Sequence, residues 1–299
     1  MYTRQDKIME IISHVVLIVG SLLALLPFVL LVSASFTDNE TAIVEGYRFI
    51  PSKFSTAAYE YIIKEWRIIG RAYMVTILVT VAGTLIALLI SGMFAYSLAQ
   101  KDLPGKSFLT CYVIFTMLFN GGIVSTYLVY TKVFSIKNTI FALLVPNLLM
   151  NAFNLILLRN YFENSIPTEL LEATRIDGAG EITIFRHIVI PLSKPIFATV
   201  GLMYALGYWN DWTNGLYFLD DKYGSQYYSI QNVLNRINEN ISFLANNSSQ
   251  LGMVMDASTL PTTTMRMAIG IVGVLPILVV YPFFQKYFVK GITIGAVKG

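Results

Sequence analysis

Six polar side chains stand inside stretches that are otherwise apolar, and their shared chemistry is hydrogen bonding. They are Asn147, Asn151, Asn154, Tyr204, Tyr208 and Asp211. Spacings of four and then three residues separate the members of each trio, which predicts that each trio lies on one face of a helix. Polar groups are costly inside a membrane, so these side chains are candidates either for a translocation path or for hydrogen bonds between helices.

A second set of candidate residues lies in the polar segment 165–191, which apolar stretches flank on both sides. Pro167 predicts the first turn of a short helix, and Glu169 and Glu172 place negative charge near the positive end of its dipole. Asp177 and Gly178 predict its end, because glycine accepts the left-handed backbone that a helix terminus often needs. We expect a second short helix over 181–189, ending at Pro191.

Other chemistries find little support in the spacing of residues. Gly105-Lys106-Ser107 ends like a phosphate-binding loop, but that loop needs a glycine where Gln100 stands, so we expect no ATP binding. His14 and His187 have no partner at the spacing of metal ligands or of a nucleophile and base. Cys111 is the only cysteine, which excludes an internal disulfide. We therefore expect no catalytic residue, metal site or cofactor.

The composition indicates a membrane protein. Hydrophobic residues make up 55% of the 299 residues and charged residues 13%, and the mean hydropathy is +0.62. Nothing in the charge distribution points to nucleic acid. We expect an all-α membrane protein, a single domain over 1–299, with about six transmembrane helices. The expected spans are 11–35, 72–98, 108–130, 139–158, 195–216 and 264–288.

The segment 165–191 carries a family resemblance. Glu172-Ala173-Thr174, three residues, Gly178, nine residues and then Ile188-x-Ile190-Pro191 resembles the "EAA" loop of ABC-importer permeases. That pattern is Glu-Ala-Ala, Gly and Ile-x-Leu-Pro, and the chain departs from it at Thr174 and Ile190. The flanking sequences RIDGAG and IPLSKP are similar to the carbohydrate-uptake, maltose-type branch. The resemblance implies the fold of type I ABC-importer permeases, with a permease core over 72–290.

This resemblance implies a function and a set of partners. The chain would be one permease of an ATP-driven, binding-protein-dependent importer of oligosaccharides, working by alternating access. Its partners would be a second homologous permease, two ATPase subunits, an extracellular solute-binding protein, the sugar and membrane lipid, and hydrolysis would be left to the ATPases. The residues expected to couple to the ATPase are Glu169, Leu170, Leu171, Glu172, Ala173, Thr174, Asp177 and Gly178.

Three other segments extend the resemblance. Trp209-Asn210-Asp211 resembles a Trp-Asn-acid stretch of sugar permeases, and 119–127 resembles a GG-x-x-P-T-Y segment of the oligosaccharide subgroup, with Ser125 in place of proline. The C-terminal sequence KGITIGAVKG is similar to the tail of the second maltose-type permease. Lysine and arginine are nearly balanced between the two sides of the expected membrane segments. The resemblance therefore decides the orientation, with both termini cytoplasmic in a bacterial inner membrane.

The outer loop 217–263 contains a helical pattern. Apolar residues recur at spacings of three and four: Ile230, Val233, Leu234, Ile237, Ile241 and Leu244. The helix either lies on the membrane surface or packs on the permease, with a polar tip at 246–250 that meets the binding protein. An alternative function, an ATP-independent secondary transporter or channel, calls for a charged residue in mid-membrane. Asp211 comes closest to that requirement.

Overall fold

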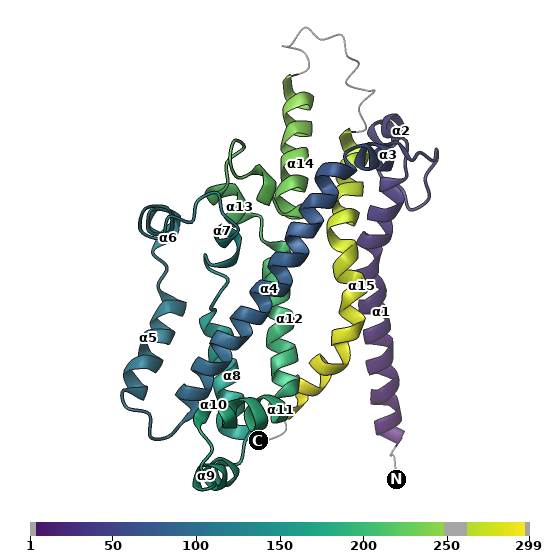
Figure 1. The fold of residues 1–299 in the computed structure, drawn as a ribbon. Coiled ribbons are helices and arrows are strands. Elements are labelled where there is room, and N and C mark those ends of the chain that lie inside the picture. The colour runs from purple at the N-terminus through teal and green to yellow at the C-terminus, as the bar shows by residue number, and fades with distance from the viewer. Residues whose placement is uncertain (1–3, 248–261, 297–299) are drawn as a thin grey trace. The chain divides into compact units, whose positions relative to one another are not determined.

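The computed structural model describes residues 4–247 and 262–296 (Figure 1). These residues form helices and one isolated β-bridge between Thr37 and Phe54. The chain divides into two compact units. One unit comprises Met1–Arg67 and Leu234–Pro276, and the other comprises Ile68–Val233 and Ile277–Gly299.

The first unit contains α1 (Arg4–Ser35), α2 (Asn39–Glu45) and α3 (Ala57–Lys64). Most of α1 is apolar and solvent-exposed, and the connection to the short helices begins at its C-terminal end. There the ring of Phe36 stacks on Phe54 and Tyr59, with centroids 5.3 and 4.7 Å apart. The Tyr59 hydroxyl lies 2.8 Å from Ser35 Oγ, so aromatic packing and a hydrogen bond together fix α3 against the end of α1.

The second unit holds most of the remaining helices. They are α4 (Trp66–Ala99, whose first two residues belong to the first unit), α5 (Lys106–Leu118), α6 (Gly122–Leu128), α7 (Phe141–Leu144), α8 (Ala152–Ser165), α9 (Thr168–Ile176), α10 (Glu181–Ile184), α11 (Ile190–Leu192), α12 (Lys194–Asn210) and α13 (Thr213–Phe218). A π turn at Val129–Val133 follows α6, and a 3-10 turn occupies Ser225–Tyr227. The core of the second unit includes Leu155, Leu158 and Val200, which are fully buried between α8 and α12. The helices α14 (Ile230–Asn247) and α15 (Thr262–Ala296) have residues in both units.

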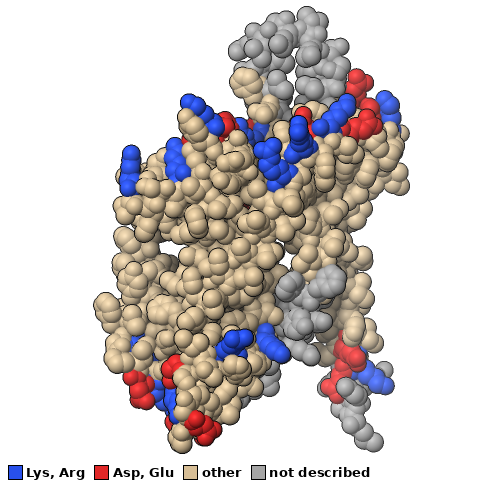
Figure 2. All heavy atoms as spheres, viewed as in Figure 1, with Lys and Arg blue, Asp and Glu red and all other residues tan. Residues whose placement is uncertain are grey.

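Three helical segments of the described chain are long and apolar enough to cross a membrane, by length and composition: 6–35, 66–99 and 263–282. They correspond to the first, second and last expected spans. Two bent pairs pass the same test only when each is counted as one span, which would make up to five: α5 with the helix after it, bent by 117°, and 181–192 with α12, bent by 88°. On the face drawn in Figure 2, charged side chains gather near the ends of these helices and uncharged ones cover their middles. This distribution is typical of helices that span a lipid bilayer.

The other three expected spans are not single helices, so their predicted continuity is wrong. The third breaks at Phe119–Gly121, where Asn120 Oδ1 accepts the Gly122 N–H at 2.9 Å and Gly122 has a φ of +78°. The fourth breaks between α7 and α8, at Pro146 and the left-handed Asn147. Proline lacks the N–H that would continue the helix, and a left-handed residue ends it.

The fifth span breaks at Asp211. Its carboxylate accepts the N–H groups of Thr213 and Asn214, at 3.1 and 3.2 Å, and so caps a new short helix, α13, in place of a last turn of α12.

Candidate functional site

The polar segment between α8 and α12 forms two short helices joined by a tight turn, here called the elbow (168–192). α9 begins directly after Pro167, one residue later than predicted, and ends at Ile176. Gly178 has a φ of +86°, and its N–H donates to the Arg175 carbonyl at 3.0 Å. The prediction that a left-handed glycine ends this helix is therefore confirmed.

The second helix of the elbow runs further than predicted. α10 continues through a π turn at Phe185–Val189 into α11, and the chain passes Pro191 before it turns at Ser193 into α12. The prediction that the helix ends at Pro191 is therefore wrong. A proline ring meets the carbonyl four residues earlier in a regular α-helix, and the wider π turn just before Pro191 relieves that contact.

The side chains of α9 divide between the core and the surface. Leu171 is 9% exposed and belongs to the hydrophobic core, whereas Leu170 is 41% exposed. The backbone carbonyl of Leu170 accepts a hydrogen bond from Thr174 Oγ1 at 2.7 Å. The other expected coupling residues, Glu169, Glu172, Ala173, Asp177 and Gly178, are exposed.

Two isoleucines that the sequence reasoning missed are among the most exposed apolar side chains of the elbow. Ile176 is 85% exposed and Ile182 is 75% exposed, one on each side of the glycine turn. The sequence contained a signal for Ile176, since this apolar residue stands at the end of α9, directly before Asp177-Gly178, and not on the face of α9 that Leu171 buries. An exposed apolar pair within a polar surface is typical of a docking site.

Glu181 connects the two arms of the elbow to α4. Arg175 Nε donates to Glu181 Oε1 at 2.8 Å, and the Tyr96 hydroxyl donates to Glu181 Oε2 at 2.5 Å. The hydrogen bond from Arg175, followed by that from Tyr96, lowers the pKa of Glu181 below its ordinary value of 4.5. Glu181 is therefore ionised at neutral pH, and its charge holds both neighbours.

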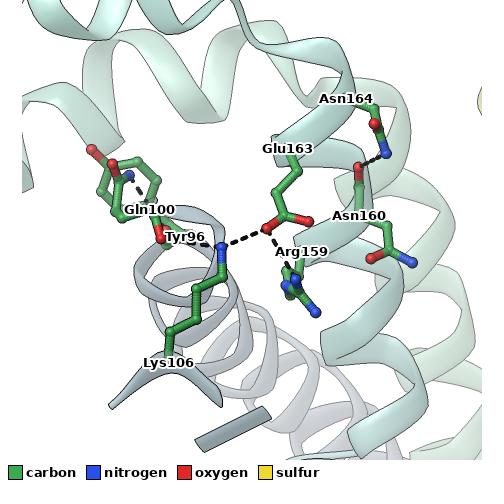
Figure 3. Close-up of polar contacts among 7 residues, drawn as sticks. All are labelled: Tyr96, Gln100, Lys106, Arg159, Asn160, Glu163 and Asn164. Atoms are coloured by element: carbon green, nitrogen blue, oxygen red, sulfur yellow. Dashed lines mark hydrogen bonds and ion pairs between the residues drawn. The ribbon is translucent and has the colours of Figure 1, made fainter. Parts of the chain in front are cut away.

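Lys106, from the sequence that resembles a phosphate-binding loop, has protein partners in the structure. Its ammonium donates to the Gln100 carbonyl at 3.2 Å and to Glu163 Oε1 at 2.8 Å, as Figure 3 shows. Arg159 also donates to Glu163 Oε1, at 3.0 Å. The ammonium thus joins the ends of α4 and α8 at the start of α5, and a cavity of about 190 Å³ lies beside it, lined by Gln100, Glu163 and Arg175 among others.

The asparagine trio does not form one helix face as predicted, whereas Tyr204 and Tyr208 both lie on α12 and Asp211 directly follows it. Asn147 lies between helices with a φ of +61°, and Asn151 is the N-cap of α8, where its Oδ1 accepts the Asn154 N–H at 3.1 Å. Asn154 is buried, whereas Asn147 and Asn151 are exposed. The predicted single face of asparagines is wrong, because the helix begins only at Ala152.

The two tyrosines of α12 hydrogen-bond to neighbouring segments. Tyr204 OH lies 2.7 Å from Ser91 Oγ and accepts the Asn151 N–H at 3.1 Å. Tyr208 OH donates to the Leu144 carbonyl at 2.9 Å. The tyrosines therefore fasten α12 to α4 and to both ends of the break between α7 and α8.

A buried amide network fixes the Pro146 side of this break. Asn214 Nδ2 donates to the Pro146 carbonyl at 3.0 Å, and Asn232 Nδ2 donates to the Trp212 carbonyl at 2.5 Å. Ser229 Oγ donates to Asn232 Oδ1 at 2.7 Å, and the Ile230 N–H donates to Thr76 Oγ1 at 2.8 Å. The Pro146 carbonyl and the Ile230 N–H thereby gain partners at the ends of broken helices inside an apolar protein.

Comparison with known proteins identifies the family. Residues 4–294 match the family described as "Binding-protein-dependent transport system inner membrane component". The chain belongs to this family.

Two relatives of this transport family cover nearly the whole chain. The polygalacturonan/rhamnogalacturonan transport system permease protein YtcP of Bacillus subtilis is 38% identical over 99% of the chain and all of its own length. The trehalose/maltose transport system permease protein MalG of Thermococcus litoralis is 25% identical over 97% of the chain and 99% of its own length. The crystal structure of a bacterial ABC transporter involved in the import of the acidic polysaccharide alginate superposes with a TM-score of 0.77 and 28% identity, covering 96% of this chain and 99% of that one.

Membership of this family, together with the fold, establishes the coarse function. The chain is an all-α, multi-pass inner-membrane permease subunit of a binding-protein-dependent ABC importer, with the type I permease fold. Such a subunit implies a partner permease, an ATPase and a solute-binding protein. The predicted family and fold class are confirmed.

Proposed function

We propose that the elbow is the surface through which this permease couples to its ATPase. The observation that carries this proposal is the exposure of Ile176 and Ile182 on a segment that also exposes the carboxylates of Glu169, Glu172 and Asp177. An apolar cleft with a basic rim on the ATPase would complement it, because apolar contact supplies affinity and opposite charge supplies orientation. Residues Leu170, Ala173 and Thr174 extend the same surface, and Gly178 sets its angle.

Leu171 has a different role in this proposal. Since its side chain packs in the core, it holds α9 against the permease and leaves the ATPase contact to Leu170 and the isoleucines. Movement of the ATPase would then act on the permease body through a residue that is already embedded in it.

Replacing the isoleucines tests the docking surface. In proteoliposomes that hold the complete transporter, Ile176→Asp with Ile182→Asp should abolish co-purification of the ATPase or its stimulation by the binding protein. Val44→Asp, at a residue 83% exposed in the other unit, is the matched control and should change neither. If wild-type permease transports without any ATPase, the coupled importer is refuted and the ATP-independent secondary transporter or channel takes its place.

We further propose that the substrate is an oligosaccharide, and that it carries uronic-acid carboxylates. The names of the relative at 38% identity and of the alginate importer support this choice, since both of those polysaccharides are built with uronic acids. Relatives named for neutral sugars are more distant than the relative at 38%, at 24–28% identity. A screen of the cognate binding protein against oligogalacturonides, alginate oligomers and raffinose decides between them, and tight binding of raffinose alone would refute an acidic substrate.

The translocation path is proposed to pass the break between α7 and α8. Asn147 and Asn151 are exposed there, and amides can hydrogen-bond to sugar hydroxyls. Asn154, Tyr204, Tyr208 and Asp211 would support the path by fixing the break. Asn147→Ala should raise the KM for uptake with little change in ATPase activity, whereas a path elsewhere would leave the KM unchanged.

The outer loop 217–263 is proposed to meet the binding protein. The predicted helix within it is confirmed as α14, and Ile230, Val233 and Leu234 are buried as the apolar stripe requires. The side chains of Ile241, Leu244 and residues 246–247 are not described, and residues 248–250 of the proposed tip lie outside the described chain. Cysteines placed in this tip should crosslink to the binding protein in the ATP-bound state, and crosslinks to lipid or the partner permease alone would refute the contact.

The orientation of the chain belongs to the same proposal. Both termini and the elbow would be cytoplasmic, and the C-terminal sequence, helical to Ala296, would follow the ATPase interface. Residues 297–299 lie outside the described chain. Thiol labelling of a cysteine at position 5 by an impermeant reagent should occur only in inside-out vesicles.

A further inference from the structure

Gln100, directly after α4, is hydrogen-bonded to two separate segments, the elbow and the start of α5. Its Oε1 accepts Arg175 Nη2 from the elbow at 2.7 Å, and its backbone carbonyl accepts Lys106 Nζ from α5 at 3.2 Å. Its Nε2 also donates to the Tyr96 carbonyl at 3.4 Å, so the side chain is oriented by its own helix. One residue therefore contacts the elbow through its side chain and the start of α5 through its backbone carbonyl.

The elbow has a second attachment to α4, four residues earlier. Glu181 accepts from Tyr96 OH with one oxygen and from Arg175 with the other. Arg175 thereby spans the glycine turn, from the end of α9 to the start of α10, and reaches α4 as well. The planar guanidinium makes these contacts with a fixed fork geometry that a lysine cannot reproduce.

We propose that Tyr96, Gln100, Arg175 and Glu181 form a clamp that fixes the angle of the elbow and transmits its movement to α4. This proposal rests on the coupling function proposed above and assigns it positioning residues that do not touch the ATPase. Lys106 and Glu163 extend the clamp to α8 (Figure 3). The elbow, α4, α5 and α8 then move as one body at this end of the second unit.

The alternative role for these residues is simple stabilisation of a surface loop. Arg175 is 37% exposed and Glu181 is 57% exposed at the side chain, and ion pairs this open contribute little to stability. Tyr96, by contrast, is 6% exposed, and its ring packs on Phe185 of the elbow with centroids 5.7 Å apart. A clamp that holds an angle predicts loss of coupling with retained assembly, whereas a merely structural contact predicts loss of both or of neither.

The test uses the complete transporter in proteoliposomes and measures sugar imported per ATP hydrolysed. Glu181→Gln, Arg175→Lys and Tyr96→Phe should each lower this ratio about fivefold while the ATPase still co-purifies. The double variant Arg175→Glu with Glu181→Arg, which restores opposite charges across the turn, should recover at least half of the wild-type ratio. Lys132→Gln, at an exposed cation outside the elbow and the clamp, is the control and should leave the ratio unchanged.

The outcomes separate the clamp from the docking surface. If Tyr96→Phe and Glu181→Gln match Lys132→Gln, or if the charge exchange lowers the ratio as much as the more impaired of Arg175→Glu alone and Glu181→Arg alone, the clamp is refuted. Should the charge variants fail to assemble, Tyr96→Phe still decides, because it removes only a hydroxyl. If wild-type ATPase activity does not respond to the binding protein and sugar at all, the coupling function itself has failed.

Discussion

Replacement of Gly178 tests how strictly the angle of the elbow is set. At a φ of +86° a residue with a Cβ is strained, although an added Cβ would meet nothing within 4 Å. The penalty is therefore conformational and not steric crowding by neighbours, and it amounts to roughly 1–2 kcal/mol. A free-energy cost of this size lowers the population of the native turn by about five- to thirtyfold relative to competing turns.

Gly180 supplies a matched control two residues away. It also has open space around it, but its φ of −73° suits any residue, and it is the N-cap of α10, where serine is favourable. Gly178→Ser should therefore lower sugar import per ATP, and Gly180→Ser should not. The defect should deepen in Gly178→Val, since a β-branched residue tolerates positive φ least.

The assay is uptake and ATPase activity of the whole transporter, with co-purification of the ATPase as the measure of assembly. All variants should assemble, because Gly178 and Gly180 are exposed and an added Cβ at either meets nothing within 4 Å. Equal import per ATP for Gly178→Ser and Gly180→Ser would refute the argument from backbone conformation. A variant Gly178→Val with normal uptake would remove the elbow from the coupling mechanism altogether.

Three further predictions concern the interior and the pH response. Gly83→Ala should lower the free energy of unfolding by about 1–3 kcal/mol, because an added Cβ would lie 2.5–2.7 Å from the Tyr208 ring; thermal unfolding in detergent measures this, with Gly20→Ala, in open space, as control. Tyr208→Phe should cost about 1 kcal/mol through the lost hydrogen bond to the Leu144 carbonyl, and a Tm equal to that of wild type would contradict that role. Arg175 and Tyr96 lower the pKa of Glu181, so its ionised form stabilises the elbow above pH 4.5, and this contribution is lost as the pH falls below 4.5 through the folded-state pKa. The protection factors of α9 and α10 against hydrogen exchange should therefore fall over this range in wild type and stay unchanged in Glu181→Gln.

Local chemistry was enough to predict several features of the fold. The apolar spans that became α1, α4 and α15 were found from hydropathy alone, and the stripe of α14 was found from its period. The Gly178 turn was predicted because it depends on one residue's backbone freedom.

Features that depend on distant partners could not be predicted. Leu171 and Leu170 have the same hydrophobicity, and only the packing of α9 on the core makes one buried and the other exposed. The spacing of Asn147 and Asn151 fits a helix, but a proline before them and caps supplied from α12 and α13 favour a break. Gln100 and Arg175 are 75 residues apart, and no periodicity relates them.

The unbroken course of α4 has a mechanical consequence. Its 34 residues, at a rise of 1.5 Å each, make a rod about 51 Å long (Figure 1). A rod of that length turned by about 10° around one end carries its other end through roughly 9 Å, which exceeds the diameter of a sugar ring. A displacement of the elbow too small to disturb its own hydrogen bonds would thus become a larger displacement at the far end of α4. The spans that contain α5, α7, α8 and α12 are interrupted, and their breaks are the points at which the remaining helices would bend.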